Sequence, residues 1–272
     1  GVSVYTRNLI SRLAALSPGD DFILFSYFFR DHALKAARLR PGPSDRWRNW
    51  TLRVPESVVS RLEWGWGLAP TGRYLRARGA DLFHTQRTPR TKLLPTVVTI
   101  HDLFPAVHPE WVSPFTFEQS ERVLRPGMDN VDRVIAVSAH TKKDIVERWG
   151  VAPERVVVIH EGVDRAAYHP STPERLAQVR AAYSLPERFI LMVGPFDAWC
   201  DPKVVLDAAA RLPAPLSGVG IVFAGSKGGV GEAAQRQAEM LGLTPRCRWT
   251  GFVPRADLVG LYGAAEALVY PS

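Results

Sequence analysis

The chain has 272 residues, of which 46% are hydrophobic, 22% charged and 10% aromatic. This length is too great for one small domain and suits two domains of ordinary size, and the apolar content excludes disorder of the whole chain. The formal net charge of +7 suggests nucleic acid, an anionic membrane surface or a phosphorylated ligand as partner.

The first part of the chain is predicted to alternate helix and strand. An amphipathic helix is expected over residues 3–16, with Ser3 as its cap, followed by an apolar strand over Phe22–Tyr27. Residues 56–79 are expected to be helical in part, with breaks near Gly65 and Pro70. Further strands are predicted at 81–84, 96–100, 133–137 and 155–159, and further helices at 115–124 and 139–149. Ser138 is the expected N-cap of the last helix and Gly150 its stop.

The segment 161–164 breaks this pattern and is interpreted as an interdomain connection. After it, helices are predicted at 172–183, 203–212, 230–241 and 255–265, and strands at 189–193, 221–224, 246–249 and 267–270. Alternating strands and helices predict an α/β fold of parallel sheets with helices on both faces. We therefore expect two Rossmann-like, doubly wound domains, over residues 1–164 and 165–272. The first is expected to lack its first strand and the second to be incomplete, as in an internal piece of a longer protein.

The basic residues are concentrated between Arg30 and Lys92, where 14 Lys and Arg face 5 Asp and Glu. The same region holds several tryptophans, at positions 47, 50, 64 and 66. Aromatic rings among cations favour a lipid headgroup interface or a phosphate-bearing partner. The alternative is a solvated basic face whose tryptophans belong partly to the core. No nucleic-acid-binding motif is present, so we expect no nucleic acid partner.

The two cysteines, Cys200 and Cys247, cannot form a disulfide framework and lack the CxxC spacing. A reducing, cytoplasmic setting is therefore expected, with peripheral binding at the inner membrane face if the basic region contacts lipid. Because no HExxH or CxxC motif occurs and the histidines are scattered, no metal site is expected.

Ligands of open parallel sheets bind outside the carboxyl ends of the strands. In the first half these positions hold His84, His101 with Asp102, and Ser138. In the second half they hold Gly194, Gly225 and Gly251, with Lys227 close behind Gly225. Glycines there let backbone N–H groups approach a phosphate, and Lys227 supplies charge. A lone histidine at a strand end is more often a hydrogen-bonded structural residue than a catalyst, and each glycine can simply serve a turn.

Several motifs resemble those of the family 4 (retaining) GT-B glycosyltransferases. The helix start Gly-Val-Ser-Val-Tyr, the His-Asp motif, the Ser-x-x-Thr-Lys-x-Asp helix start and the Gly-Val-Asp crossover occur in the family's order. They lie at positions 1–5, 101–102, 138–144 and 162–164, and a closing set of similar motifs covers 249–272. Each motif is modest alone, whereas the ordered set covers nearly the whole chain.

The resemblance implies transfer of a sugar from a nucleotide-sugar to an acceptor hydroxyl, with retained configuration and no metal or other cofactor. The donor binds the C-terminal domain and a glycan or lipid-linked acceptor binds the N-terminal one. His101 and Asp102 are then the catalytic candidates. The implied donor-binding residues are Gly1, Ser138, Gly194, Lys203, Gly225, Lys227, Phe252 and Val253.

One departure from the family's pattern concerns the cations that hold the donor diphosphate. Where the family places an Arg and a Lys after the first donor-domain strand, this chain has Pro195 or Trp199, and Cys200. Lys203 follows one turn later. Loss of both cations removes several kcal/mol of charge stabilisation in a dry site. Three readings therefore stay open: an active hexosyltransferase whose 272 residues alone turn over little, a degenerate GT-B domain acting as a binding or scaffold protein, or a sugar-nucleotide epimerase.

Overall fold

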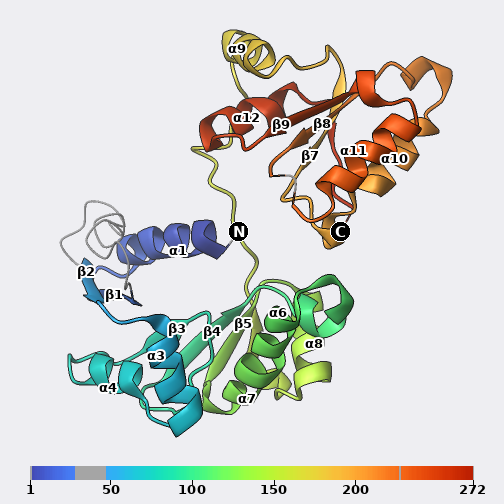
Figure 1. Cartoon of the computed structure of the whole chain (residues 1–272). Coiled ribbons are helices and arrows are strands. Elements are labelled where there is room, and N and C mark those ends of the chain that lie inside the picture. Colours follow the sequence, from blue (N-terminus) through green and yellow to red (C-terminus); the bar gives the residue numbers. More distant parts are fainter. Residues whose placement is uncertain (1, 28–46, 227, 272) are drawn as a thin grey trace. The chain divides into compact units, whose positions relative to one another are not determined.

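The computed structural model describes residues 2–27, 47–226 and 228–271. The chain divides into two compact units, Gly1–Glu161 and Gly162–Ser272. Each unit is built from parallel strands and helices that alternate along the sequence (Figure 1).

The first unit contains two separate parallel sheets. A two-stranded sheet pairs β1 with β2, and a four-stranded sheet has the order β3-β4-β5-β6. The strands are β1 (Phe22–Tyr27), β2 (Trp47–Leu52), β3 (Phe83–Thr85), β4 (Thr96–Ile100), β5 (Arg133–Ala136) and β6 (Val156–Val158). The helices are α1 (Val2–Leu16), α3 (Glu56–Ser60), α4 (Pro70–Arg76), α5 (Phe104–Val107), α6 (Pro114–Gln119), α7 (Arg125–Gly127) and α8 (Ala139–Trp149). One π-helical turn, Arg61–Gly65, continues α3, and another, Ser120–Leu124, continues α6.

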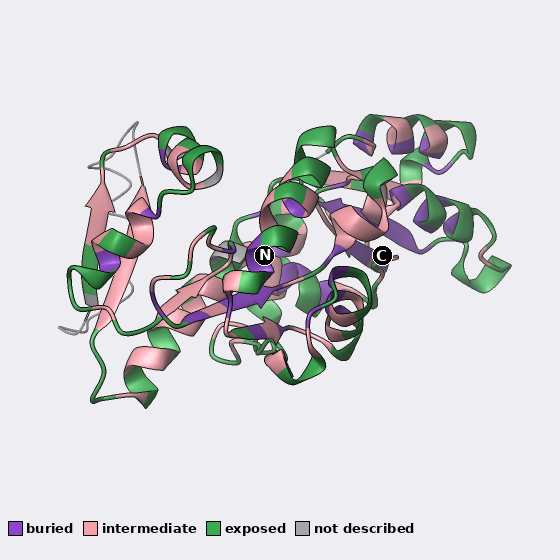
Figure 2. Ribbon diagram, turned by 90° about the horizontal axis from the view of Figure 1, so that it is seen from below, coloured by how far each residue is buried: buried purple, intermediate pink, exposed green. Residues whose placement is uncertain are grey.

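The core of the first unit lies on one face of the four-stranded sheet. Alternate residues of β4 and β5, such as Val98 and Val134, are fully buried against Ile145 and Trp149 of α8. Ser138 accepts a hydrogen bond from the Thr141 N–H and so caps α8, and Gly150 ends that helix with φ of 70°. The buried central strands stand out in Figure 2.

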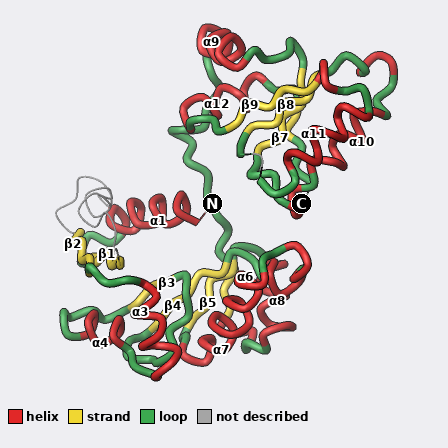
Figure 3. The backbone as a smooth tube through the Cα atoms, viewed as in Figure 1, coloured by secondary structure: helices red, strands yellow, loops and turns green. Residues whose placement is uncertain are grey.

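The second unit is a four-stranded parallel sheet in the order β10-β7-β8-β9. Its strands are β7 (Phe189–Val193), β8 (Gly220–Ala224), β9 (Cys247–Gly251) and β10 (Ala267–Leu268), and its helices are α9 (Pro173–Tyr183), α10 (Pro202–Ala210), α11 (Gly231–Met240) and α12 (Arg255–Ala264). Figure 3 shows helices on both sides of this sheet. One apolar cluster joins Met192 and Phe223 to α10 and α11, and another joins Leu191 and Val222 to α9 and α12.

The predicted α/β class with parallel sheets is confirmed, and the bounds of β1, β4, β7 and α8 are those expected from the sequence. Two local predictions are wrong. Ser3 lies inside α1, which begins at Val2, so it is not an N-cap. The strand β2 was missed because its sequence, Trp-Arg-Asn-Trp-Thr-Leu, lacks the apolar run or strict alternation that marks a buried strand.

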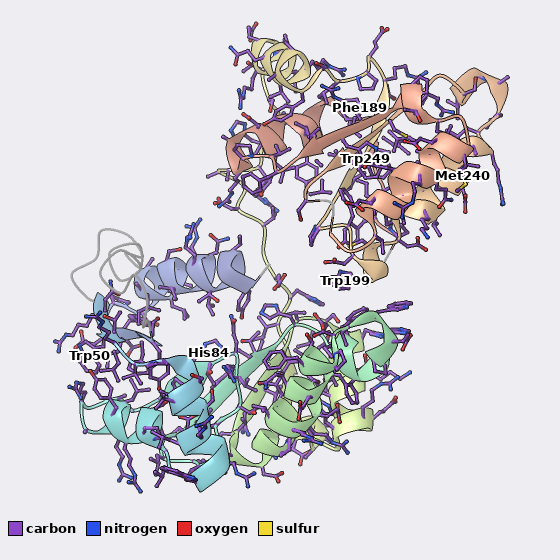
Figure 4. All side chains as sticks on the ribbon, viewed as in Figure 1. Trp50, His84, Phe189, Trp199, Met240 and Trp249 are labelled. Carbon is purple, nitrogen blue, oxygen red and sulfur yellow. The ribbon has the colours of Figure 1, made fainter. Side chains whose placement is uncertain are left out.

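The basic, tryptophan-bearing region is partly described. Its residues 28–46, which hold several of the cations, lie outside the described residues. Trp50, labelled in Figure 4, is half-buried. Its ring lies edge-on to Tyr74 at 6.2 Å between centroids, and the Arg78 guanidinium lies 3.6 Å from the Tyr74 ring centre. Trp66, by contrast, has 70% of its surface exposed. One tryptophan of this region therefore belongs to a small core and another faces solvent.

Both cysteines lie in the second unit and are free thiols. Cys200 is fully buried, with its Sγ 3.2 Å from the Tyr270 hydroxyl. Cys247 is half-buried at the start of β9, and burial raises the pKa of its thiol to about 11.

Candidate functional site

His101 follows β4 directly, at the carboxyl end of the four-stranded sheet of the first unit. Its Nδ1 lies 2.9 Å from Oε1 of Glu161, and the Tyr5 ring meets its imidazole edge-on at 4.8 Å. The His101 carbonyl accepts a hydrogen bond from Oγ1 of Thr141, at 3.2 Å. The ring and the backbone of His101 are thus both held by neighbours from other elements.

The second ring nitrogen of His101, Nε2, differs from Nδ1 in its hydrogen bonding. Nε2 is buried and, among the described residues, has no hydrogen-bond partner. A carboxylate only accepts, so Nδ1–H donates to Glu161; Nε2 then accepts from a ligand in the neutral form of the ring and donates in the protonated form. A buried polar atom without a partner is costly and rare in proteins, so Nε2 is a candidate for a hydrogen bond to a ligand.

A second histidine takes part in a chain of side-chain hydrogen bonds. Nε2 of His84, in β3, lies 2.8 Å from Oγ1 of Thr99, which in turn lies 3.2 Å from the Tyr5 hydroxyl. His84 is labelled in Figure 4. Burial lowers the pKa of His84 below its ordinary value of 6.5, because desolvation disfavours the imidazolium. The chain links β3, β4 and α1 with a neutral histidine at one end.

The other polar candidates of the first unit have backbone partners. Oδ1 of Asp102 accepts from the Phe104 N–H at 3.0 Å, and its side chain is exposed. Oγ of Ser138 accepts from the Thr141 N–H at 3.0 Å. Gly1 lies outside the described residues. The structure thus brings His101 together with Tyr5, and gives Asp102 and Ser138 contacts that shape the loops behind it.

Sequence reasoning did not select three residues that contact the histidines: Tyr5, Thr99 and Glu161. Thr99 is inward-facing on a buried strand, and a polar residue there is a detectable signal. Glu161 sits in the crossover segment, 60 positions from His101. Only the folded chain shows that these two meet.

In the second unit, the ends of β7 and β8 approach very closely. A Cβ added to Gly225, whose φ is 141°, would lie 2.1 Å from the carbonyl oxygen of Gly194, so no larger residue fits without a shift of the backbone. The Gly194 N–H donates to the Ala224 carbonyl at 3.0 Å, and the Gly225 N–H to the Gly251 carbonyl at 2.8 Å. Both amides therefore already have acceptors within the chain.

The loop after β7 is filled by its own side chains. Phe196 and Cys200 are fully buried, and Oδ1 of Asp197 accepts a hydrogen bond from the Gly229 N–H at 3.1 Å. A carboxylate thus takes a glycine N–H of the kind expected to face a phosphate. Lys203 is exposed on the first turn of α10 and enters no ion pair with other described residues, and Lys227 lies outside them.

The remaining donor-side candidates follow β9. Phe252 has 82% of its surface exposed, whereas Val253 is buried in the cluster on the α9 and α12 face of the sheet. Within the described ranges, no group of three or more His, Cys, Asp and Glu side chains is arranged to hold a metal ion. No helix there has the length and apolar character to cross a bilayer.

Two family models match this chain. Residues 1–167 match the model described as Glycosyltransferase Family 4, and residues 173–272 match Glycosyl transferases group 1. The chain belongs to glycosyltransferase family 4. A D-inositol 3-phosphate glycosyltransferase of Mycobacterium tuberculosis is 34% identical over 151 residues, which are 53% of this chain and 30% of that relative. This glycosyltransferase chain therefore matches less than a third of its relative's length.

Solved structures share the fold of the chain. Anabaena Alr3699/HepE in complex with UDP and glucose has a TM-score of 0.68 at 18% identity, covering 99% of this chain and 70% of that one. Sucrose-phosphate synthase from Thermosynechococcus elongatus has a TM-score of 0.69 at 21% identity, covering 100% and 70%. These likenesses confirm the GT-B fold predicted from the sequence.

The lowered pKa of His84 makes the stability of the first unit depend on pH. The unfolded chain binds a proton to this histidine below pH 6.5, whereas the folded chain resists protonation until lower pH. The contribution of His84 to stability is therefore fully present above pH 6.5 and is lost as pH falls below it.

We expect His84→Gln, which keeps a hydrogen-bonding group near Thr99, to weaken this loss of stability in acid. The free energy of unfolding in urea, measured at one pH above and one pH below 6.5, tests this expectation. His140→Gln changes a surface histidine whose side chain is 83% exposed and should keep the pH dependence of the parent. If His84→Gln and His140→Gln behave alike, His84 is not the group responsible.

Proposed function

We propose that this protein transfers a sugar from a nucleotide-sugar to an acceptor hydroxyl, with retention of configuration and without a metal. Membership of glycosyltransferase family 4 supports this, as do neighbours of the same fold that were solved with UDP and UDP-glucose. In this proposal the first unit binds the acceptor, the second binds the donor, and both contribute to one reaction. We also propose that the acceptor-binding domain ends near residue 164 and that the donor-binding domain follows it.

The observation that carries the proposal is Nε2 of His101, which is buried and has no hydrogen-bond partner in the described part of the chain. Glycosyl transfer passes through an oxocarbenium-like state, and hydrogen bonds to the sugar hydroxyls strengthen as that state forms. A fixed acceptor nitrogen that receives a sugar hydroxyl fits this need, since it is positioned before the reaction begins. Glu161 positions the ring by accepting the Nδ1 proton, which keeps the lone pair on Nε2.

His101→Ala is expected to lower kcat about 100-fold, the size of effect found when one preorganised hydrogen-bonding group is removed. Transfer from UDP-, GDP- and ADP-sugars, together with calorimetry of donor binding, measures this on the longest natural form of the protein. Glu161→Ala should lower kcat by a smaller factor and Glu161→Gln should restore most of it, because the amide oxygen still accepts from Nδ1. The proposal fails if no nucleotide-sugar binds or if His101→Ala leaves kcat unchanged.

A second candidate function is that of a binding or scaffold domain that has lost catalysis. The observation that favours it is the loop after β7, where Asp197 takes a glycine N–H and buried Phe196 and Cys200 fill the interior. A carboxylate beside a diphosphate repels it, and the loop offers no described cation in compensation. Weak or absent binding of the nucleotide diphosphate would follow.

Asp197→Ala tests how far this carboxylate opposes the donor. The change frees the Gly229 N–H and removes one negative charge, so UDP affinity should rise about fivefold, which corresponds to about 1 kcal/mol. Asp207→Asn, which removes a charge from the exposed face of α10, is the matched control and should leave UDP affinity unchanged. Isothermal calorimetry gives both values. Equal affinities of the parent and Asp197→Ala would show that the carboxylate does not oppose the phosphate.

For the acceptor side, we propose contact with an anionic membrane that presents a lipid-linked acceptor. Exposed Trp66 and Leu68 lie between the turn that carries Arg61 and the helix that carries Arg73 and Arg76. Aromatic rings beside arginines suit the headgroup region of a bilayer.

Trp66→Ala is expected to lower binding to vesicles of anionic lipid by about tenfold or more, which corresponds to roughly 1.5–3 kcal/mol for a ring fully buried in lipid. Trp111→Ala, which removes another exposed tryptophan that stacks on His108 at 4.0 Å, is the control and should bind like the parent. Vesicle sedimentation at low and high salt measures both. Vesicle binding that does not change with salt concentration, or that falls equally in the two variants, argues against a membrane partner.

A further inference from the structure

Three aromatic rings gather on the segment that follows His101. Phe104 begins α5, His108 comes directly after that helix, and Trp111 ends the 3₁₀ turn Pro109–Trp111. The Trp111 ring stacks on the His108 imidazole, at 4.0 Å between centroids and 13° between planes, and the Phe104 ring centre lies 5.6 Å from that of Trp111. We call the stacked pair of Trp111 and His108 the aromatic platform.

The platform presents an apolar surface beside two polar groups. Trp111 keeps 41% of its surface exposed although one ring face lies on His108. Its indole N–H, which can only donate, has no acceptor among the described residues. The carboxylate of the preceding residue, Glu110, accepts the His108 Nδ1–H at 3.1 Å and is 60% exposed. An open aromatic surface, a donor and an acceptor thus lie within two neighbouring residues.

Prolines hold the backbone around the platform. Pro105, Pro109 and Pro114 lie in the first turns of α5, of the 3₁₀ turn and of α6. Proline fixes φ near the helical value and suits such a position. The Trp111 N–H donates to the His108 carbonyl at 3.1 Å. A ring that is fixed before a ligand arrives loses little conformational entropy when the ligand binds.

The charges near the platform favour an uncharged ligand. Residues 102–121 contain four Asp and Glu and no Lys or Arg, and only two of these carboxylates pair with arginines, at positions 122 and 125. The remaining carboxylates, Asp102 and Glu110, repel the phosphates of lipids and nucleic acids. A hydrocarbon chain over the ring would cover the indole N–H and Glu110 without offering hydrogen bonds, which is costly.

We propose that Trp111, supported by His108, is a stacking platform for an uncharged oligosaccharide, the acceptor of the transfer proposed above. The C–H groups on one face of a pyranose ring form an apolar surface that packs on an aromatic ring. The hydroxyls at the rim of the sugar ring both donate and accept, so they suit the indole N–H and the Glu110 carboxylate. Binding sites of this kind combine apolar area with a few placed polar groups.

The platform lies a short way along the chain from His101. Oδ1 of Asp102 accepts from the Phe104 N–H, so α5 begins almost directly after β4. The four residues of α5 rise about 6 Å and the three residues of the 3₁₀ turn about 6 Å. A few linked sugar units span such a distance. The platform therefore binds a unit remote from the reacting hydroxyl and selects for the length of the acceptor.

A glycan array of uncharged oligosaccharides, applied to the longest natural form of the protein without nucleotide-sugar, tests the platform. At least one glycan should bind, and Trp111→Ala should lower its affinity about tenfold or more in isothermal calorimetry. Trp111→Phe, which keeps a ring, should retain most of the affinity. In transfer assays, Trp111→Ala should raise KM for that oligosaccharide and leave KM for its terminal monosaccharide unchanged.

Phe115→Ala is the matched control. Phe115 is an aromatic residue of α6 that is 70% exposed and makes no ring contact with another described residue, so this variant should bind the glycan like the parent. If Trp111→Ala does not fold, Trp111→Leu keeps apolar volume without a ring face and should show the same loss.

Three results overturn the proposal. The first is an array on which no uncharged oligosaccharide binds, and the second is equal glycan affinity of the parent and the Trp111→Ala or Trp111→Leu variant. The third is weaker binding of Trp111→Ala to lipid vesicles that carry no glycan, because the occupant is then lipid. The array holds no nucleotide-sugar, so these results are distinct from a failure of the donor to bind.

Discussion

Parallel pairing of the strands is the constraint from which the candidate sites follow. Every strand pair in the described chain is parallel, so the carboxyl ends of neighbouring strands meet at one edge of each sheet. This is why His84 and His101, 17 positions apart in the printed sequence, are both linked to Tyr5 or its partner Thr99. A parallel sheet also requires cover on both faces, which the second unit obtains from its two helix pairs.

Much of the fold could be predicted because local and global signals agree. The apolar, β-branched runs of β4 and β7 are bounded by polar or turn residues, and α8 has both a serine cap and a glycine stop. The strand β2 was not predicted, because a tertiary contact that the local sequence does not show, that of Trp50 with Tyr74, helps to place it. Here packing overrides the local pattern.

The candidate site was only partly predictable, for a related reason. Position after a strand was enough to select His101, but its partner Glu161 lies in a segment with no regular structure, and no periodicity connects the two. The same holds for Asp197, whose carboxylate meets Gly229 across a sequence separation of 32. The missing cations after β7 were visible in the sequence, whereas the carboxylate that binds the glycine loop was not.

The two units differ in how their polar groups are used. In the first, Nε2 of His101 is buried and has no hydrogen-bond partner among the described residues, while Glu161 and Tyr5 contact the ring. In the second, the amides of Gly194 and Gly225 and the Gly229 N–H are all bonded within the chain. If the second unit binds a donor as proposed, these amides would exchange internal hydrogen bonds for external ones.

The burial of the two thiols has a practical consequence for studying motion. Only thiolates react with maleimides and related reagents, and a pKa of about 11 leaves Cys247 almost wholly protonated at neutral pH. Cys200 is shielded by its full burial. A pair of cysteines introduced at exposed sites, one in each unit, can therefore carry fluorescent labels without removal of the native thiols. Energy transfer between such labels reports the separation of the units directly, with and without a nucleotide-sugar.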